Sequence, residues 1–143
     1  MTQTTLANYD TVLEFDPVTD LLSYKASLPT ATKMLSGVVL GSKLYVAGGE
    51  THTGIHGSGA PWCFLSDDTY SYDPALDSWA TLTEFETYIP TVGAMGGRCL
   101  AGAAEADGNL VLLGGYTLPM AGMGPPPCPT NQGLVDVIAE FAP

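Results

Sequence analysis

Two short patterns recur along this chain in the same order, and this internal repetition constrains the fold more than any other feature of the sequence. An aromatic-x-Pro triplet begins at Phe15, begins again 57 residues later at Tyr72, and begins a third time at Phe141. A glycine pair that ends an apolar run occurs at Gly48-Gly49 and again 66 residues later at Gly114-Gly115. The repetition predicts similar units that stack on one another, because one short unit cannot bury its own apolar face.

Within each repeat, short segments have the composition and alternation of β-strands. Two hairpins are predicted, one with strands at 36–40 and 43–47 and one with strands at 100–105 and 109–113. The second is joined by Asp107-Gly108, and both residue types tolerate the positive φ of a two-residue turn. Strands are also predicted at each aromatic-x-Pro triplet and around Trp79. This gives four strands per unit and an all-β chain.

The spacing of the aromatic residues resembles that of a known repeat. Trp79 follows Tyr72 by seven residues, and Leu22 follows Phe15 at the same distance. Together with the glycine pairs, these residues resemble the Kelch repeat over nearly the whole chain, from 11 to 143. The resemblance implies Kelch-type β-propeller blades of four antiparallel strands in an incomplete propeller. It implies structural roles for Gly48, Gly49, Tyr72, Asp73, Pro74, Trp79, Gly114 and Gly115.

The repeats divide the chain into four stretches. Residues 1–10 are predicted to be an N-terminal tail, 11–35 a partial blade, 36–90 a complete blade and 91–143 a second partial blade. The arginine that Kelch blades carry near the start of their first strand is matched by Arg98, and less well by Lys33. Propellers use about 4–8 blades, so 143 residues predict either a part of a longer Kelch protein or a homo-oligomer that completes a propeller.

Long segments follow both glycine pairs, at 50–69 and 116–133, and both are rich in Gly and Pro without periodicity. They are predicted to be loops, and loops of this length in a compact domain are usually functional or disordered. The Kelch resemblance implies that they form a partner-binding surface. The candidate binding residues in them are Glu50, His52, His56, Trp62, Phe64, Asp67, Asp68, Tyr116, Met120 and Met123.

Some of these candidates fit two interpretations. The apolar ones either anchor a partner or pack beneath the loops as a satellite core. His52 and His56 with nearby carboxylates could ligate a transition metal, and Asp67-Asp68 could bind calcium through oxygen. Their spacing matches neither an established metal site nor an EF-hand, so no metal and no cofactor is predicted.

The three cysteines form no CxxC pair. Cys63 and Cys128 occupy equivalent places in the two long segments. They either form a disulfide between neighbouring units or remain two independent thiols. Cys99 falls in a predicted strand, where a small buried apolar residue is expected.

The charge balance narrows the choice of partner. The chain has 15 Asp and Glu against 4 Lys and Arg, a net charge of −11. Nucleic acids and anionic membranes are disfavoured, because binding to them needs clustered basic residues. A protein or peptide with a basic patch is the partner that this charge favours. The start of the chain has no secretory signal pattern, which favours an intracellular location.

Catalytic motifs are absent from the sequence: it has no GxSxG, no P-loop and no GxGxxG after a strand. The glycine-rich stretch 93–97 is predicted to lie between strands and has no lysine. The leading hypothesis is therefore a non-enzymatic protein-interaction module. The alternatives are a fragment of a Kelch-type propeller enzyme, such as a galactose-oxidase-like oxidase or a sugar isomerase, and a structural fragment without independent activity.

Overall fold

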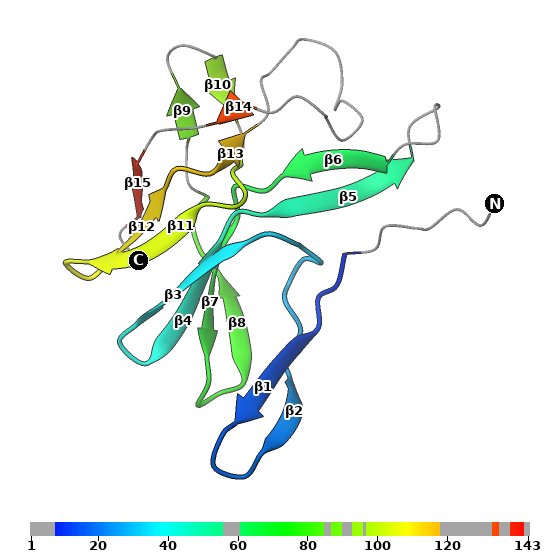
Figure 1. Cartoon of the computed structure of the whole chain (residues 1–143), viewed down its shortest axis with the longest axis vertical. Coiled ribbons are helices and arrows are strands. Elements are labelled where there is room, and N and C mark those ends of the chain that lie inside the picture. The colour runs from blue at the N-terminus through cyan, green and yellow to red at the C-terminus, as the bar shows by residue number, and fades with distance from the viewer. Residues whose placement is uncertain are drawn as a thin grey trace.

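The computed structural model describes residues 8–55, 61–84, 87–89, 93–95, 97–117, 133–134 and 138–141. In these ranges every regular element is a β-strand, and all strand pairs are antiparallel (Figure 1). No helix in them is long and apolar enough to cross a bilayer. The predicted all-β class is confirmed.

A four-stranded sheet occupies the middle of the molecule. Its order is β3 (Ser36–Leu40), β4 (Lys43–Ala47), β7 (Thr69–Asp73) and β8 (Ser78–Thr81). The predicted hairpin of β3 and β4 is confirmed, and Gly41 supplies the positive φ of 59° at its turn. The predicted strand around Trp79 is β8, which places this residue opposite Tyr72.

Two smaller sheets flank this one (Figure 1). The N-terminal sheet is the hairpin of β1 (Val12–Asp16) and β2 (Leu21–Lys25). The C-terminal sheet has the order β11 (Gly102–Ala106), β12 (Asn109–Leu113) and β15 (Ile138–Phe141). The strands predicted at the first and third aromatic-x-Pro triplets are therefore present as β1 and β15.

The prediction of an unpaired loop over 50–69 was wrong. Strands β5 (Glu50–Ile55) and β6 (Pro61–Leu65) form a hairpin there, with an irregularity in register between His52 and Ile55. The sequences of the two strands lack the strict alternation of polar and apolar residues by which strands are recognised. The segment 116–133 likewise contains pairing, between β13 (Tyr116–Thr117) and β14 (Gly133–Leu134).

The glycine-rich stretch 93–97 also differs from its prediction. Gly93–Met95 is strand β10, and it pairs with β9 (Thr87–Ile89). Gly97 follows with a φ of 67°, and a Cβ there would collide with the backbone of Leu65. The glycines in this stretch thus allow pairing and a close approach of two chain segments.

The two repeats superimpose in their backbone pairing. An isolated bridge joins Lys33 to Glu50, and its counterpart 66 residues later joins Cys99 to Tyr116. Lys33 is therefore the counterpart of Cys99, and Arg98 is the counterpart of the residue before Lys33. This corrects by one residue the predicted match between Lys33 and Arg98. The match relied on residue charge, whereas the strand pairing sets the true register.

The core lies between the four-stranded sheet and the C-terminal sheet, where β3 lies beside β11 and β12. Three buried residues form its centre, namely Ala47, Leu110 and Leu112. Partly buried apolar residues from both sheets pack around them: Val38, Leu40, Tyr45, Ala101 and Ala103. Polar bonds join the same sheets, since Ser36 Oγ donates to Ala101 O at 2.6 Å and Leu100 N donates to Met34 O at 3.1 Å.

Candidate functional site

The β5–β6 hairpin is anchored by its first residue. Glu50 is 8% exposed and its Oε1 lies 2.8 Å from Lys33 Nζ. The Lys33 and Glu50 backbones exchange two hydrogen bonds, and Asn8 Nδ2 donates to Glu50 O at 2.9 Å. Glu50 therefore holds the base of the hairpin, and its side chain lies largely inside the protein.

A hydrogen-bonded group follows β6, at the corner where the chain enters β7. Asp68 Oδ2 accepts from Ser66 Oγ at 2.8 Å and from Tyr70 OH at 2.9 Å. The Tyr70 hydroxyl also lies 3.1 Å from Thr30 Oγ1. Burial raises the pKa of Tyr70, and the neighbouring Asp68 carboxylate acts in the same direction. The corner is thus fixed by Asp68, a predicted candidate, together with Ser66 and Tyr70, which were not predicted to take part.

An acidic surface lies at this corner, formed by Asp67, Asp68 and Glu84. Their carboxylate oxygens lie within 4.8 Å of one another, with Glu84 exposed and the two aspartates partly exposed. Glu84 is brought there by the β7–β8 pairing, after which Leu82 N donates to Thr69 O at 2.8 Å. Such a group attracts cations, including the side chains of Lys and Arg.

An exposed aromatic residue precedes the acidic surface in the chain. Phe64 on β6 is 37% exposed and pairs with Thr51 on β5. Aromatic residues are enriched at protein-binding surfaces. The structure brings two of the predicted binding candidates, Asp67 and Asp68, together with Glu84.

The other candidates are placed differently. Tyr116 is buried and opens β13, where its backbone pairs with Cys99. His52 and Trp62 lie on the hairpin strands β5 and β6. His56, Met120 and Met123 lie outside the described residues, as does Cys128, so the predicted alternatives for Cys63 and Cys128 stay predictions.

The predicted burial of Cys99 is confirmed, although the residue lies in an isolated β-bridge and not in a strand. Its side chain is 1% exposed, and burial raises the pKa of the thiol to about 11. It neighbours Arg98, whose burial lowers the pKa of the guanidinium. The Arg98 backbone joins two corners of the chain, because its carbonyl accepts from Gly49 N at 2.7 Å and its amide donates to Ser66 O at 3.1 Å.

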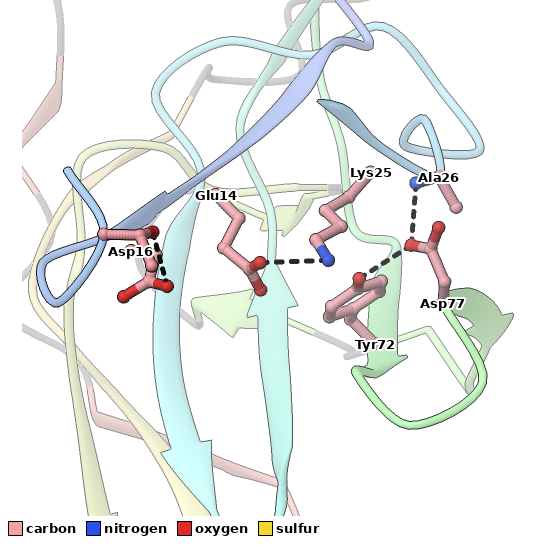
Figure 2. Close-up of polar contacts among 7 residues, drawn as sticks. Glu14, Asp16, Lys25, Ala26, Tyr72 and Asp77 are labelled. Carbon is pink, nitrogen blue, oxygen red and sulfur yellow. Dashed lines mark hydrogen bonds and ion pairs between the residues drawn. The ribbon is translucent and has the colours of Figure 1, made fainter. Parts of the chain in front are cut away.

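A second polar group joins the N-terminal hairpin to the turn after β7 (Figure 2). Asp77 Oδ1 accepts from Ala26 N at 2.9 Å and from Tyr72 OH at 2.7 Å. Trp79 Nε1 donates to Ala26 O at 2.8 Å, and its ring lies 5.0 Å from that of Tyr72. On the hairpin, Lys25 Nζ lies 2.9 Å from Glu14 Oε1. Tyr72 and Trp79 thus both take part in the contact between the N-terminal hairpin and the four-stranded sheet.

These hydrogen bonds lower the pKa of Asp77 and raise the pKa of Tyr72. The Ala26 amide, followed by the Tyr72 hydroxyl, holds the pKa of Asp77 below its usual 3.8. The Asp77 carboxylate, followed by burial, raises the pKa of Tyr72 to about 12. The Asp77 contribution to stability is therefore present at neutral pH and is lost as the pH falls through the lowered pKa. The Tyr72 contribution is present below pH 10 and is lost as the pH rises toward 12.

We expect Asp77→Asn to lower the pKa of Tyr72 toward 10, because the substitution removes the negative charge that opposes tyrosinate formation. Tyrosine absorbance during alkaline titration measures this, with Tyr72→Phe identifying the affected transition. Asp20→Asn is the matched control, because Asp20 occupies the corresponding turn position, with a φ of 58° against 48° for Asp77. An alkaline titration that Asp77→Asn leaves unchanged would contradict the proposed coupling.

No protein-family model matches the chain, and no curated protein matches it. Among solved structures the chain is similar to that of YjhT, with a TM-score of 0.51 and 17% sequence identity. The similarity covers 82% of this chain and 37% of YjhT, so the chain spans little more than a third of that structure's length. At this identity the likeness concerns the fold alone, and it agrees with the all-β arrangement.

Proposed function

We propose that the chain is part of a Kelch-type propeller and acts as a non-enzymatic module that binds a basic protein or peptide. The repeat pattern and the matched strand registers support the Kelch assignment. The observation that carries the binding proposal is the acidic surface at the base of a projecting hairpin. Asp67 and Glu84 belong to it, and Phe64 lies on the adjoining strand.

The physical basis is charge complementarity with an apolar contact. Three carboxylates within 4.8 Å create a negative potential, which the overall charge of −11 reinforces. Lys and Arg side chains of a partner would offset the repulsion among the three carboxylates. Phe64 would supply apolar surface that binding removes from water. Each exposed ion pair contributes about 0.2–1 kcal/mol, so affinity falls as salt rises.

The test measures binding of a labelled 15-residue peptide rich in Lys and Arg, by fluorescence anisotropy at low and physiological salt. Asp67→Asn combined with Glu84→Gln is expected to weaken binding by about threefold to tenfold, from the loss of two exposed charge pairs. Asp68 is retained because it organises Ser66 and Tyr70.

The matched control combines Asp10→Asn with Asp107→Asn, which removes the same charge from exposed positions elsewhere. If both double variants weaken binding equally, net charge alone accounts for it and the acidic surface is not the binding site. Equal binding of a Glu-rich peptide of the same length would also contradict the proposal.

A further inference from the structure

Strands β1, β7 and β15 end alike, and β7 and β15 also hold the same position in their sheets. Strand β7 pairs with β4 so that Tyr72 lies opposite Leu44, and β15 pairs with β12 so that Phe141 lies opposite Leu110. Strand β1 ends in the same way as β15, since Val-Leu-Glu-Phe at 12–15 matches Ile-Ala-Glu-Phe at 138–141. Each is followed by a residue and then a proline. The sequence of β1 therefore suits this strand to pair with β12 in the way that β15 does.

The β1–β2 hairpin also matches β7–β8 in detail. Phe15 lies opposite Leu22 as Tyr72 lies opposite Trp79. In both turns the first aspartate accepts a hydrogen bond from the backbone amide two residues later. Val18 N donates to Asp16 Oδ1 at 2.8 Å, and Ala75 N donates to Asp73 Oδ1 at 3.0 Å. The hairpin is thus an outer strand pair that lacks the inner pair which β3 and β4 supply to β7 and β8.

The two flanking sheets are incomplete in complementary ways. Within the described ranges, no strand pairs with the second edge of β1, and none pairs with the outer edge of β15. The inner pair β11–β12 is present without a fourth strand, and the outer pair β1–β2 is present without inner strands. The outer pair β1–β2 would complete the inner pair β11–β12 in the place that β15 occupies.

Exposure shows which face of β1–β2 is uncovered. Residues directly opposite in an antiparallel pair share a face, and this places four apolar side chains together. They are 54%, 54%, 67% and 80% exposed, in the order Leu13, Phe15, Leu22 and Tyr24. The corresponding β7 residues, Tyr70 and Tyr72, are 5% and 7% exposed. Tyr70 and Tyr72 are therefore buried where an inner pair is present, whereas Leu13 and Phe15 are exposed where it is absent.

We propose that the β1–β2 hairpin of one copy pairs with β12 of a second copy and takes the place of β15 there. The shared register sets Phe15 opposite Leu110 and Leu13 opposite Leu112. Leu110 and Leu112 are buried at the centre of the core, so Leu13 and Phe15 enter the same face and extend it. Leu13 replaces the smaller Ala139, and β2 adds the fourth strand.

The exchange takes place between copies. Figure 1 shows β1–β2 and the β11–β12–β15 sheet on different sides of the four-stranded sheet, and Ala26 is bonded to Asp77 and Trp79 of that sheet. The contact joins different surfaces of the two copies, so it is head-to-tail. Such contacts form a ring where the rotation closes and an open chain where it does not.

Multi-angle light scattering of the full chain over a range of concentrations tests the exchange. The unmodified chain is expected to form oligomers as concentration rises. Leu13→Lys combined with Phe15→Lys is expected to raise the apparent dissociation constant at least tenfold, because two charges would enter an apolar interface. Val18→Lys is the matched control, since Val18 is 90% exposed in the turn and outside the paired register.

A cross-link keeps the test independent of any effect of lysine on folding. Val12→Cys and Leu113→Cys are placed in separate chains whose Cys63 and Cys128 are serine, and the two proteins are mixed under mild oxidation. The shared register puts these positions opposite each other, so a disulfide-linked heterodimer is expected. Val18→Cys mixed with Leu113→Cys is expected to give none. A chain that stays monomeric, or oligomers that tolerate both lysines, would overturn the proposal.

Discussion

Replacing Gly49 with alanine is expected to destabilise the protein by about 2–5 kcal/mol, the sum of a left-handed backbone penalty and of overpacking. Gly49 has a φ of 103°, and a Cβ there would collide with Thr32 Cγ2 and lie 2.8 Å from Lys33 O. Both obstacles belong to the strand start that pairs with β5, so the main chain would have to move. Since folded domains are stable by only about 5–15 kcal/mol, much of the stability would be lost.

Gly41→Ala is the matched control. Gly41 has a φ of 59°, and no atom lies within 4 Å of a Cβ built there. It therefore carries only the backbone penalty of about 1–2 kcal/mol. Urea unfolding midpoints of the two variants separate the steric cost from the backbone cost. Equal midpoints would show that Gly49 is not tightly enclosed.

Gly115 extends this argument to the second repeat. It has a φ of 91°, and a Cβ there would lie 2.8 Å from Cys99 O and 3.0 Å from Ala101. The two glycines are thus confined by equivalent neighbours, each against the strand start of its own repeat. Their recurrence in the sequence reflects this shared close approach, which explains why the glycine pairs allowed the repeats to be recognised.

The strands of the four-stranded sheet and of the β11–β12 hairpin could be predicted because local signals and burial agree. In β3 and β4, apolar residues flank a turn in which Gly41 adopts positive φ. In β12, Leu110 and Leu112 alternate with less buried residues. By contrast, β5 and β6 form a ribbon apart from the main sheets, and the Gly and Pro residues around them indicated a loop.

The candidate site could be predicted only in part, for a different reason. Asp67 and Asp68 are adjacent in sequence and were identified together. Glu84 joins them only because β7 and β8 pair and return the chain to the same corner. Asp68 accepts hydrogen bonds from Ser66 and Tyr70, which lie two residues before and after it. Contacts of this kind depend on where a turn places two side chains, which residue spacing alone does not determine.

Replacing Leu110 with alanine is expected to cost about 2–5 kcal/mol, the range for deleting a fully buried leucine side chain. Leu110 is completely buried, and with Ala47 and Leu112 it forms the centre of the core between two sheets. Removing it leaves a cavity where the four-stranded sheet meets β12. Because these sheets belong to different repeats, the loss weakens the packing between repeats.

Leu113→Ala on the same strand is the matched control, because Leu113 is 45% exposed and its truncation should cost under about 1 kcal/mol. Urea unfolding monitored by tryptophan fluorescence compares the two in a Trp62→Phe background, so that Trp79 alone reports on the four-stranded sheet. If the repeats share one core, Leu110→Ala shifts this transition although Trp79 lies on a different sheet. A transition that Leu110→Ala leaves in place would mean that the two sheets unfold independently, and the repeats would then be stable without their contact.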